Sequence, residues 1–170
     1  MSSKIAESLQ RLYEQAGADA SVLDLKTIPS DCFLPTSYGK GRPDSFAPFQ
    51  EQILNSDGIL FIVPEYNGSF PGVLKYFIDL WQYPESFEGR RVAFVGVAAG
   101  QWGGLRAVEH LQGVMGYRNA RQFPMRIFIN HIYDRWDWEK SVLKKKHEKE
   151  EDLNRLLQLQ CEQFMAFCRN

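Results

Sequence analysis

Short runs of apolar residues alternate along this chain with stretches whose apolar positions recur every three or four residues. The runs at residues 58–63 and 91–97 are nearly continuous, which is typical of parallel strands buried on both faces. Shorter runs predict a strand at residues 21–25 and a last strand at residues 125–129. This pattern indicates an α/β protein.

The stretches between the runs have the spacing of amphipathic helices. The first of these helices is expected to end near Gly17, and the fourth near Gly116. Residues 29–48 are rich in Pro, Gly and Ser and predict a long loop on the ligand side of the sheet. The five expected helices lie at residues 5–13, 46–54, 74–81, 105–115 and 153–167.

Strands that alternate with helices predict parallel βαβ units with right-handed crossovers. We therefore expect residues 1–170 to form a single domain, a three-layer α/β/α sandwich around a parallel sheet. Doubly wound folds normally begin with a central strand and a phosphate-binding turn. This chain begins instead with the helix that would come next, so the first strand of the fold is missing from the expected order.

Composition narrows the class of protein. The chain is 44% hydrophobic and 24% charged, and its net charge of −1 favours neither nucleic acid nor a membrane surface as a partner. No apolar run approaches the roughly 20 residues of a membrane helix. The charge run at residues 144–152 mixes both signs, which is typical of a solvated helix. The spacing of Cys32, Cys161 and Cys168 suits no metal site, so we expect reduced thiols in a cytoplasmic protein.

Two polar, glycine-containing turns follow the two strongest strands. The first reads PEYNGSFPG at residues 64–72, and the second reads AAGQWGG at residues 98–104. Ligands of open α/β sheets bind outside the carboxyl ends of the strands, where such turns expose backbone N–H groups. Asn-Gly is also a common turn dipeptide, and Pro71 suits the start of a helix whatever the function. Composition alone leaves both interpretations open.

The order of residues in the two turns is more specific than their composition. Residues 64–79 match the pattern P-E-Y-N-G-S-x-P-G-x-L-K-x-x-x-D at every fixed position, and residues 100–107 match G-x-x-G-G-x-R-A. The sequence thereby resembles the NADPH-dependent FMN reductase family, which has a flavodoxin-like fold and includes quinone, chromate and azo-dye reductases. With the matching order of elements, the resemblance covers about residues 1–130.

The resemblance implies an oxidoreductase that uses FMN and NADPH to reduce a small-molecule electron acceptor, such as a quinone or a flavin, by two-electron transfer. It also implies a homodimer or homotetramer. The cofactor carries the hydride chemistry, so no catalytic acid or base is expected from the protein. Gly68 has no side chain and therefore allows backbone N–H groups to approach the flavin ring closely. The implied cofactor-binding residues are Ser2, Ser3, Pro64, Glu65, Tyr66, Asn67, Gly68, Ser69, Gly100, Trp102, Gly103 and Gly104.

The chain departs from the family pattern at its start. The family binds the FMN phosphate with a G-S-x-R-x-x-S-x-N loop after the central strand, and Ser2 and Ser3 correspond only to the end of that loop. Ala98 stands where many relatives have serine. In the flavodoxin-like strand order 2-1-3-4-5, strands at residues 21–25 and 58–63 would lack their shared neighbour and have exposed edges.

Three explanations of this departure are open. The natural protein extends upstream of Met1, or the chain is a truncation that closes the gap by rearrangement or strand exchange. In the third, the domain has lost flavin and become a non-catalytic binding or assembly module. Because most of the phosphate loop is absent from this sequence, we expect the chain to bind FMN weakly or not at all.

Overall fold

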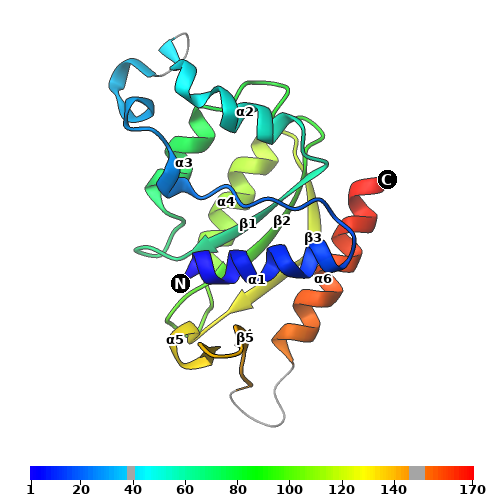
Figure 1. Cartoon of the computed structure of the whole chain (residues 1–170). Coiled ribbons are helices and arrows are strands. Elements are labelled where there is room, and N and C mark those ends of the chain that lie inside the picture. Colours follow the sequence, from blue (N-terminus) through cyan, green and yellow to red (C-terminus); the bar gives the residue numbers. More distant parts are fainter. Residues whose placement is uncertain (38–40, 146–151) are drawn as a thin grey trace.

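The computed structural model describes residues 1–37, 41–145 and 152–170 (Figure 1). At its centre is a parallel three-stranded sheet, in which β2 (Arg91–Val97) lies between β1 (Gly58–Pro64) and β3 (Arg121–Ile129). The β1–β2 pairing runs without a shift from the first residue of each strand to the last. Both strands therefore end at the same edge of the sheet. The last strand begins four residues earlier than the predicted residue 125.

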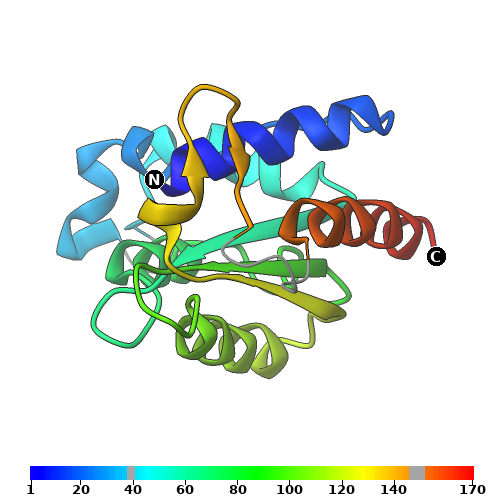
Figure 2. The same cartoon turned by 90° about the horizontal axis from the view of Figure 1, so that it is seen from below.

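Helices cover both faces of the sheet (Figure 2). Two helices, α1 (Ser2–Gln15) and α6 (Leu153–Arg169), lie on one face, and α4 (Leu105–Tyr117) lies on the other. Two more, α2 (Ala47–Leu54) and α3 (Gly72–Asp79), pack into the same core cluster as α4. The predicted three-layer α/β/α sandwich with a parallel sheet is confirmed.

The residues of β2 alternate between the two cores. Val92 and Phe94 belong to the cluster that contains the buried side chains of α4, whereas Val95 and Val97 belong to the cluster that contains those of α1 and α6. This alternation follows from the strand period of two residues. It explains why the strand reads as a continuous apolar run, because both of its faces are covered.

The five predicted helices are present. The helix α1 ends at Gln15, and Gly17 follows with a φ of +88°, the left-handed conformation that commonly follows a helix. The helix α4 begins directly after Gly104, at a φ of +86°, and extends one residue past Gly116. The predicted loop at residues 29–48 contains short 3₁₀ turns at Ser30–Phe33, Pro35–Ser37 and Asp44–Phe46.

The strand predicted at residues 21–25 is wrong. Residues 18–24 have no regular secondary structure, and Leu25–Thr27 form a 3₁₀ turn. Leu23 and Leu25 pack against the core that α2 and α3 share, so their apolar character reflects packing and not sheet pairing. Within the described residues, β1 has β2 on one side and no strand on the other, so residues 21–25 do not pair with its open edge.

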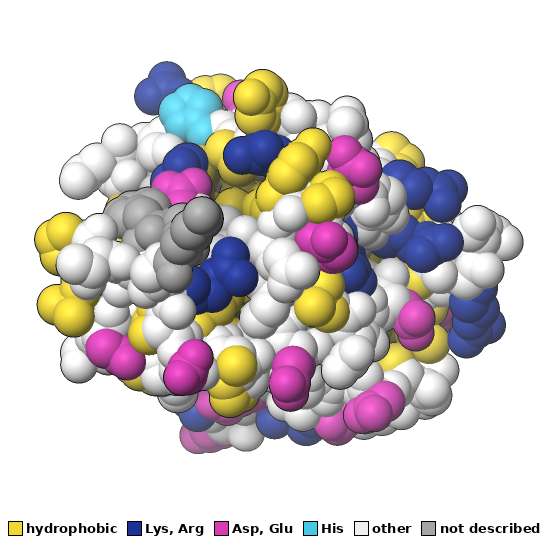
Figure 3. Space-filling view, turned by 90° about the horizontal axis from the view of Figure 1, so that it is seen from above, with side chains coloured by type: hydrophobic (Ala, Val, Ile, Leu, Met, Phe, Trp, Pro, Cys, Tyr) yellow, Lys and Arg dark blue, Asp and Glu magenta, His cyan; other side chains and the backbone are white. Residues whose placement is uncertain are grey.

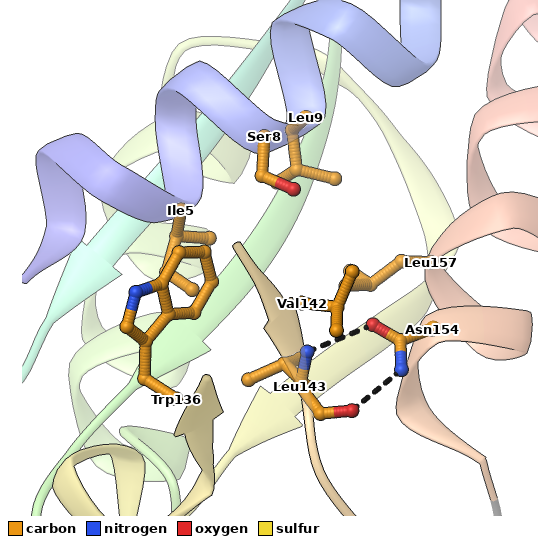
Figure 4. A pocket seen from close by; sticks show the side chains of 8 residues that line it. All are labelled: Ile5, Ser8, Leu9, Trp136, Val142, Leu143, Asn154 and Leu157. Atoms are coloured by element: carbon orange, nitrogen blue, oxygen red, sulfur yellow. Dashed lines mark hydrogen bonds between the residues drawn. The ribbon is translucent and has the colours of Figure 1, made fainter. Parts of the chain in front are cut away.

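Three short elements that the sequence did not predict follow β3. They are α5 (Ile132–Arg135) and an antiparallel ribbon of β4 (Trp136–Asp137) and β5 (Val142–Leu143). Figure 4 shows how Asn154 ties the ribbon to α6: its Nδ2 donates to Leu143 O at 2.7 Å, and its Oδ1 accepts from Leu143 N at 3.1 Å. The cavity beside this contact measures about 10 Å³, which holds at most one water.

The solvated helix predicted at residues 144–152 can be compared with the structure at only three of these residues, because the others lie outside the described residues. Lys144 and Lys145 are not helical, residues 146–151 lie outside the described residues, and α6 begins at Leu153.

On the face shown in Figure 3, acidic and basic side chains are interspersed over much of the surface. None of the helices in the described ranges combines the length and the apolar character that crossing a bilayer requires.

A buried glutamine bridges an irregular place in the sheet. The β2–β3 register shifts between Val92 and Phe94, next to Pro124, which has no N–H to donate. Gln160 of α6 is 1% exposed, and its Nε2 donates to Phe94 O at 3.1 Å and to Met125 O at 2.8 Å. The side chain thus hydrogen-bonds to two strand carbonyl groups beside this break in the ladder.

We expect Gln160→Leu to lower the free energy of unfolding by about 1–3 kcal/mol, because it leaves one buried and one partly buried carbonyl group without this donor. Gln158→Leu is the matched control, since Gln158 is exposed on the same helix. Its effect should stay within about 0.5 kcal/mol. Urea unfolding of both variants measures the difference, and equal effects would contradict the structural role of Gln160.

Candidate functional site

The chain leaves β1 through a tight turn that its own backbone closes. Tyr66 N donates to Ser69 O at 2.8 Å, and Ser69 N donates to Tyr66 O at 3.1 Å. Asn67 and Gly68 both have positive φ angles, +52° and +76°, as the two central residues of a type I′ turn do. Asparagine tolerates this conformation and glycine adopts it freely, which accounts for the Asn-Gly pair.

The second turn, which follows β2, is held by residues that come after β3. His131 N donates to Gly100 O at 3.3 Å, and Asn130 Nδ2 donates to Gln101 O at 3.0 Å. Neither Asn130 nor His131 was predicted from the sequence. The one available signal was their position directly after a strand, at the edge of the sheet where both turns were expected.

Two glycines of the second turn allow it to lie against the sheet. A Cβ atom at Gly103 would lie 2.9 Å from the carbonyl carbon of Phe128, and one at Gly104 would lie 2.8 Å from the backbone nitrogen of Val97. Both residues also have positive φ angles, +61° and +86°. Gly103 and Gly104 therefore serve the close packing of the turn on the strands, and neither lines the cleft described next.

The two turns lie on either side of a cleft of about 250 Å³ at the carboxyl edge of the sheet. The first turn contributes three of its predicted site residues and the second turn two of its own, together with two alanines. The lining residues are Glu65, Asn67, Gly68, Ala98, Ala99, Gly100 and Trp102. The fold thus brings together two segments that are about 30 residues apart in the sequence.

In the described part of the chain, two residues from each turn line the cleft and have backbone N–H groups without an acceptor. Among the described residues, no acceptor is found for the backbone N–H groups of Asn67, Gly68, Ala99 and Gly100. Trp102 is 63% exposed although it lines the cleft, so the flat face of an aromatic ring is accessible there. The arrangement suits a planar ligand whose edge carries several acceptors.

Three of the predicted residues of the first turn, Pro64, Tyr66 and Ser69, do not line the cleft. Pro64 ends β1, and the backbone bonds between Tyr66 and Ser69 close the turn. Glu65 lines the cleft, and its N–H donates to Val97 O at 3.0 Å, which extends the β1–β2 ladder by one more bond.

Ser2 and Ser3 lie apart from the cleft lining, in the first turn of α1. Figure 1 shows that the N-terminus of α1 and the turn that follows β1 lie at the same end of the sheet. The first N–H groups of a helix have no partner within the helix and favour anions. The placement of Ser2 and Ser3 is therefore compatible with the phosphate end of a ligand whose planar part lies in the cleft.

The packing of the second turn can be tested with two glycines near α4. Gly104→Ala should lower the free energy of unfolding by at least roughly 1–2 kcal/mol, because alanine is strained at a φ of +86° and its Cβ would meet the β2 backbone. Gly113→Ala, at an exposed and uncrowded position within α4, should instead raise it by about 0.5–1 kcal/mol. Thermal or urea unfolding distinguishes the two, and a shift of the same sign in both would contradict this packing.

Solved structures share this fold along almost the whole chain. The flavoenzyme NAD(P)H:(acceptor) oxidoreductase FerB from Paracoccus denitrificans superposes with a TM-score of 0.76 at 23% identity, over 99% of this chain and 90% of that one. An NADH:FMN oxidoreductase, EMOB, gives 0.73 at 17% identity, over 96% and 80%. The fold is therefore the flavodoxin-like α/β fold found in FMN reductases.

Sequence comparison gives the family. The model of the NADPH-dependent FMN reductase family matches residues 1–134, so this chain belongs to that family. An NAD(P)H-dependent FMN reductase of Pseudomonas aeruginosa is 38% identical over 98 residues, which are 56% of this chain and 52% of that protein. A 2-hydroxy-1,4-benzoquinone reductase of a Burkholderia species is 30% identical over 137 residues, 78% and 72% of the two chains. The match thus spans about half the length of the first relative.

Proposed function

We propose that this chain binds FMN in the cleft between the two turns and acts in NAD(P)H-dependent reduction of a quinone or a similar small molecule. The observation that carries the proposal is the set of four unpaired N–H groups, two from each turn, at Asn67, Gly68, Ala99 and Gly100. The two relatives named above support it, as they are called an FMN reductase and a benzoquinone reductase.

The residues of the cleft fit the flavin ring. The pyrimidine edge of an isoalloxazine ring carries two carbonyl oxygens that accept hydrogen bonds, and the cleft offers backbone donors on both sides. Its volume of about 250 Å³ lies just below the usual range of roughly 300–1,000 Å³ for small-molecule sites.

The protein's part in the reaction is binding and orientation. Asn67 and Gly68 would hold one side of the ring edge, Ala99 and Gly100 the other, and Trp102 would shield the ring from water. Ser2 and Ser3 would meet the phosphate at the N-terminus of α1. When bound, FMN supplies the hydride and electron transfer between NAD(P)H and the acceptor. No side chain is assigned as an acid or base.

The proposal includes a cytoplasmic homodimer or homotetramer. Apolar side chains are exposed on α3 and on the 3₁₀ segment beside it: Val73 is 38%, Phe33 40% and Leu34 52% exposed. The ring of Phe33 lies 5.3 Å from that of Tyr76 of α3, centroid to centroid, so the two segments form one surface. A surface of this kind suits a subunit contact.

Two glycines with similar backbones test the cleft as the flavin site. Gly68→Ala should weaken flavin binding at least about threefold, because the added methyl group strains the turn and stands at the cleft. Gly17→Ala is the matched control: its φ is +88°, a Cβ there meets nothing within 4 Å, and it lies beyond the end of α1. Fluorescence titration with FMN measures both, and equal affinities would contradict the site.

Turnover tests the activity itself. The purified chain supplied with excess FMN should oxidise NADH or NADPH in the presence of a benzoquinone, faster than free FMN does. Since Ser2 and Ser3 are the only phosphate ligands that the resemblance assigns here, FMN should bind less than about tenfold more tightly than riboflavin. A chain that binds no flavin and adds nothing to the rate of free FMN would favour the non-catalytic domain, which the named relatives do not support.

A further inference from the structure

A histidine of α4 is hydrogen-bonded to the first turn. Ser69 Oγ lies 2.9 Å from His110 Nδ1, although the two residues are 41 positions apart in the sequence. Ser69 is half-buried and His110 is exposed. Nothing in the spacing of the histidines along the sequence indicated this contact, because it depends on how α4 packs beside β1.

This hydrogen bond gives the turn a contact that its own backbone does not supply. The two bonds between Tyr66 and Ser69 shape the turn but do not fix its direction. The N–H of Glu65 fixes the beginning of the turn against β2. Among the described residues, the contact with His110 is the one side-chain hydrogen bond made by residues 65–70. It fixes the far end of the turn.

The helix that carries His110, α4, is anchored in the core and begins at the other side of the cleft. Ala107, Val108 and Leu111, which surround His110 in the sequence, are fully buried in the core. The helix begins immediately after Gly104, the last residue of the second turn. The Ser69–His110 hydrogen bond therefore joins the first turn to the element that begins at the second, and so links the two walls of the cleft.

We propose that His110 is a positioning residue of the cofactor site, which acts through Ser69 to hold the N–H groups of Asn67 and Gly68 toward the second turn. The inference deepens the proposed function and rests on it, because it assigns those N–H groups to the flavin ring. The bond does not require one tautomer: Nδ1 accepts from the serine hydroxyl when bare and donates to it when protonated. What the turn needs is a polar atom at the place of Nδ1.

Binding of lumiflavin, which has the flavin ring without a ribityl phosphate, tests the inference apart from the phosphate. His110→Phe and Ser69→Ala should each weaken binding about threefold to tenfold, the range of one net hydrogen bond. The double variant should bind no more weakly than the worse single variant, because both changes remove the same bond. His110→Asn, whose amide stands near the place of Nδ1, should restore affinity to within about twofold.

A matched control and a flavin-free measurement complete the test. Glu109→Gln, at the exposed neighbouring position of α4, should leave binding unchanged. Without flavin, hydrogen exchange of the Tyr66 and Ser69 amides should be at least about threefold faster in His110→Phe, with the same urea midpoint as the parent chain. Unchanged exchange, or single effects on lumiflavin binding that add in the double variant, would overturn the inference. If the parent chain binds neither lumiflavin nor FMN, the proposed function fails, and the exchange measurement still decides whether His110 holds the first turn in place.

Discussion

The candidate site depends on the parallel pairing of β1 and β2. The two strands pair without a shift along their whole length, and the ladder continues by one hydrogen bond from Glu65 N to Val97 O. Both strands therefore end at the same level, and the two turns that follow them have to leave the sheet side by side. The cleft is the space between these turns, so its position is a consequence of strand register.

The conformations of the two turns depend on their glycines. Gly103 and Gly104 let the second turn lie directly on the β2 and β3 backbones, in conformations that other residues rarely adopt. Asn67 and Gly68 shape the first turn so that two of its N–H groups remain unpaired at the cleft. The glycines of the two family motifs thus have different physical roles. Gly103 and Gly104 permit close packing, and Gly68 permits a turn whose central N–H groups stay unpaired.

Local patterns in the sequence predicted most of the fold. The strands at β1 and β2, the five helices and the two turns each follow from residues that are close together along the chain. The strand predicted at residues 21–25 was wrong because a short apolar run can also be buried without sheet pairing, and among the described residues β1 pairs with β2 alone. Leu23 and Leu25 serve the core without a sheet.

The site was predicted less completely, for a related reason. Of the residues that the resemblance assigned to the cofactor, five line the cleft, and their binding of flavin stays a prediction: Glu65, Asn67, Gly68, Gly100 and Trp102. The supports of the turns were missed, since Asn130, His131 and His110 reach them only through packing over long sequence separations. Short-range spacing carries no information about such contacts. The β4–β5 ribbon was missed because strands of two residues are too short to produce a pattern.

Amide NMR during a titration with FMN can show whether backbone N–H groups of both turns hold the flavin ring, as we propose. We expect four amide signals to shift together and to saturate at one equivalent of bound flavin: those of Asn67, Gly68, Ala99 and Gly100. The amide of Gly113, on the exposed side of α4, should not move. Saturable binding that leaves these four signals in place, or that shifts those of only one turn, would contradict a flavin site formed by both turns.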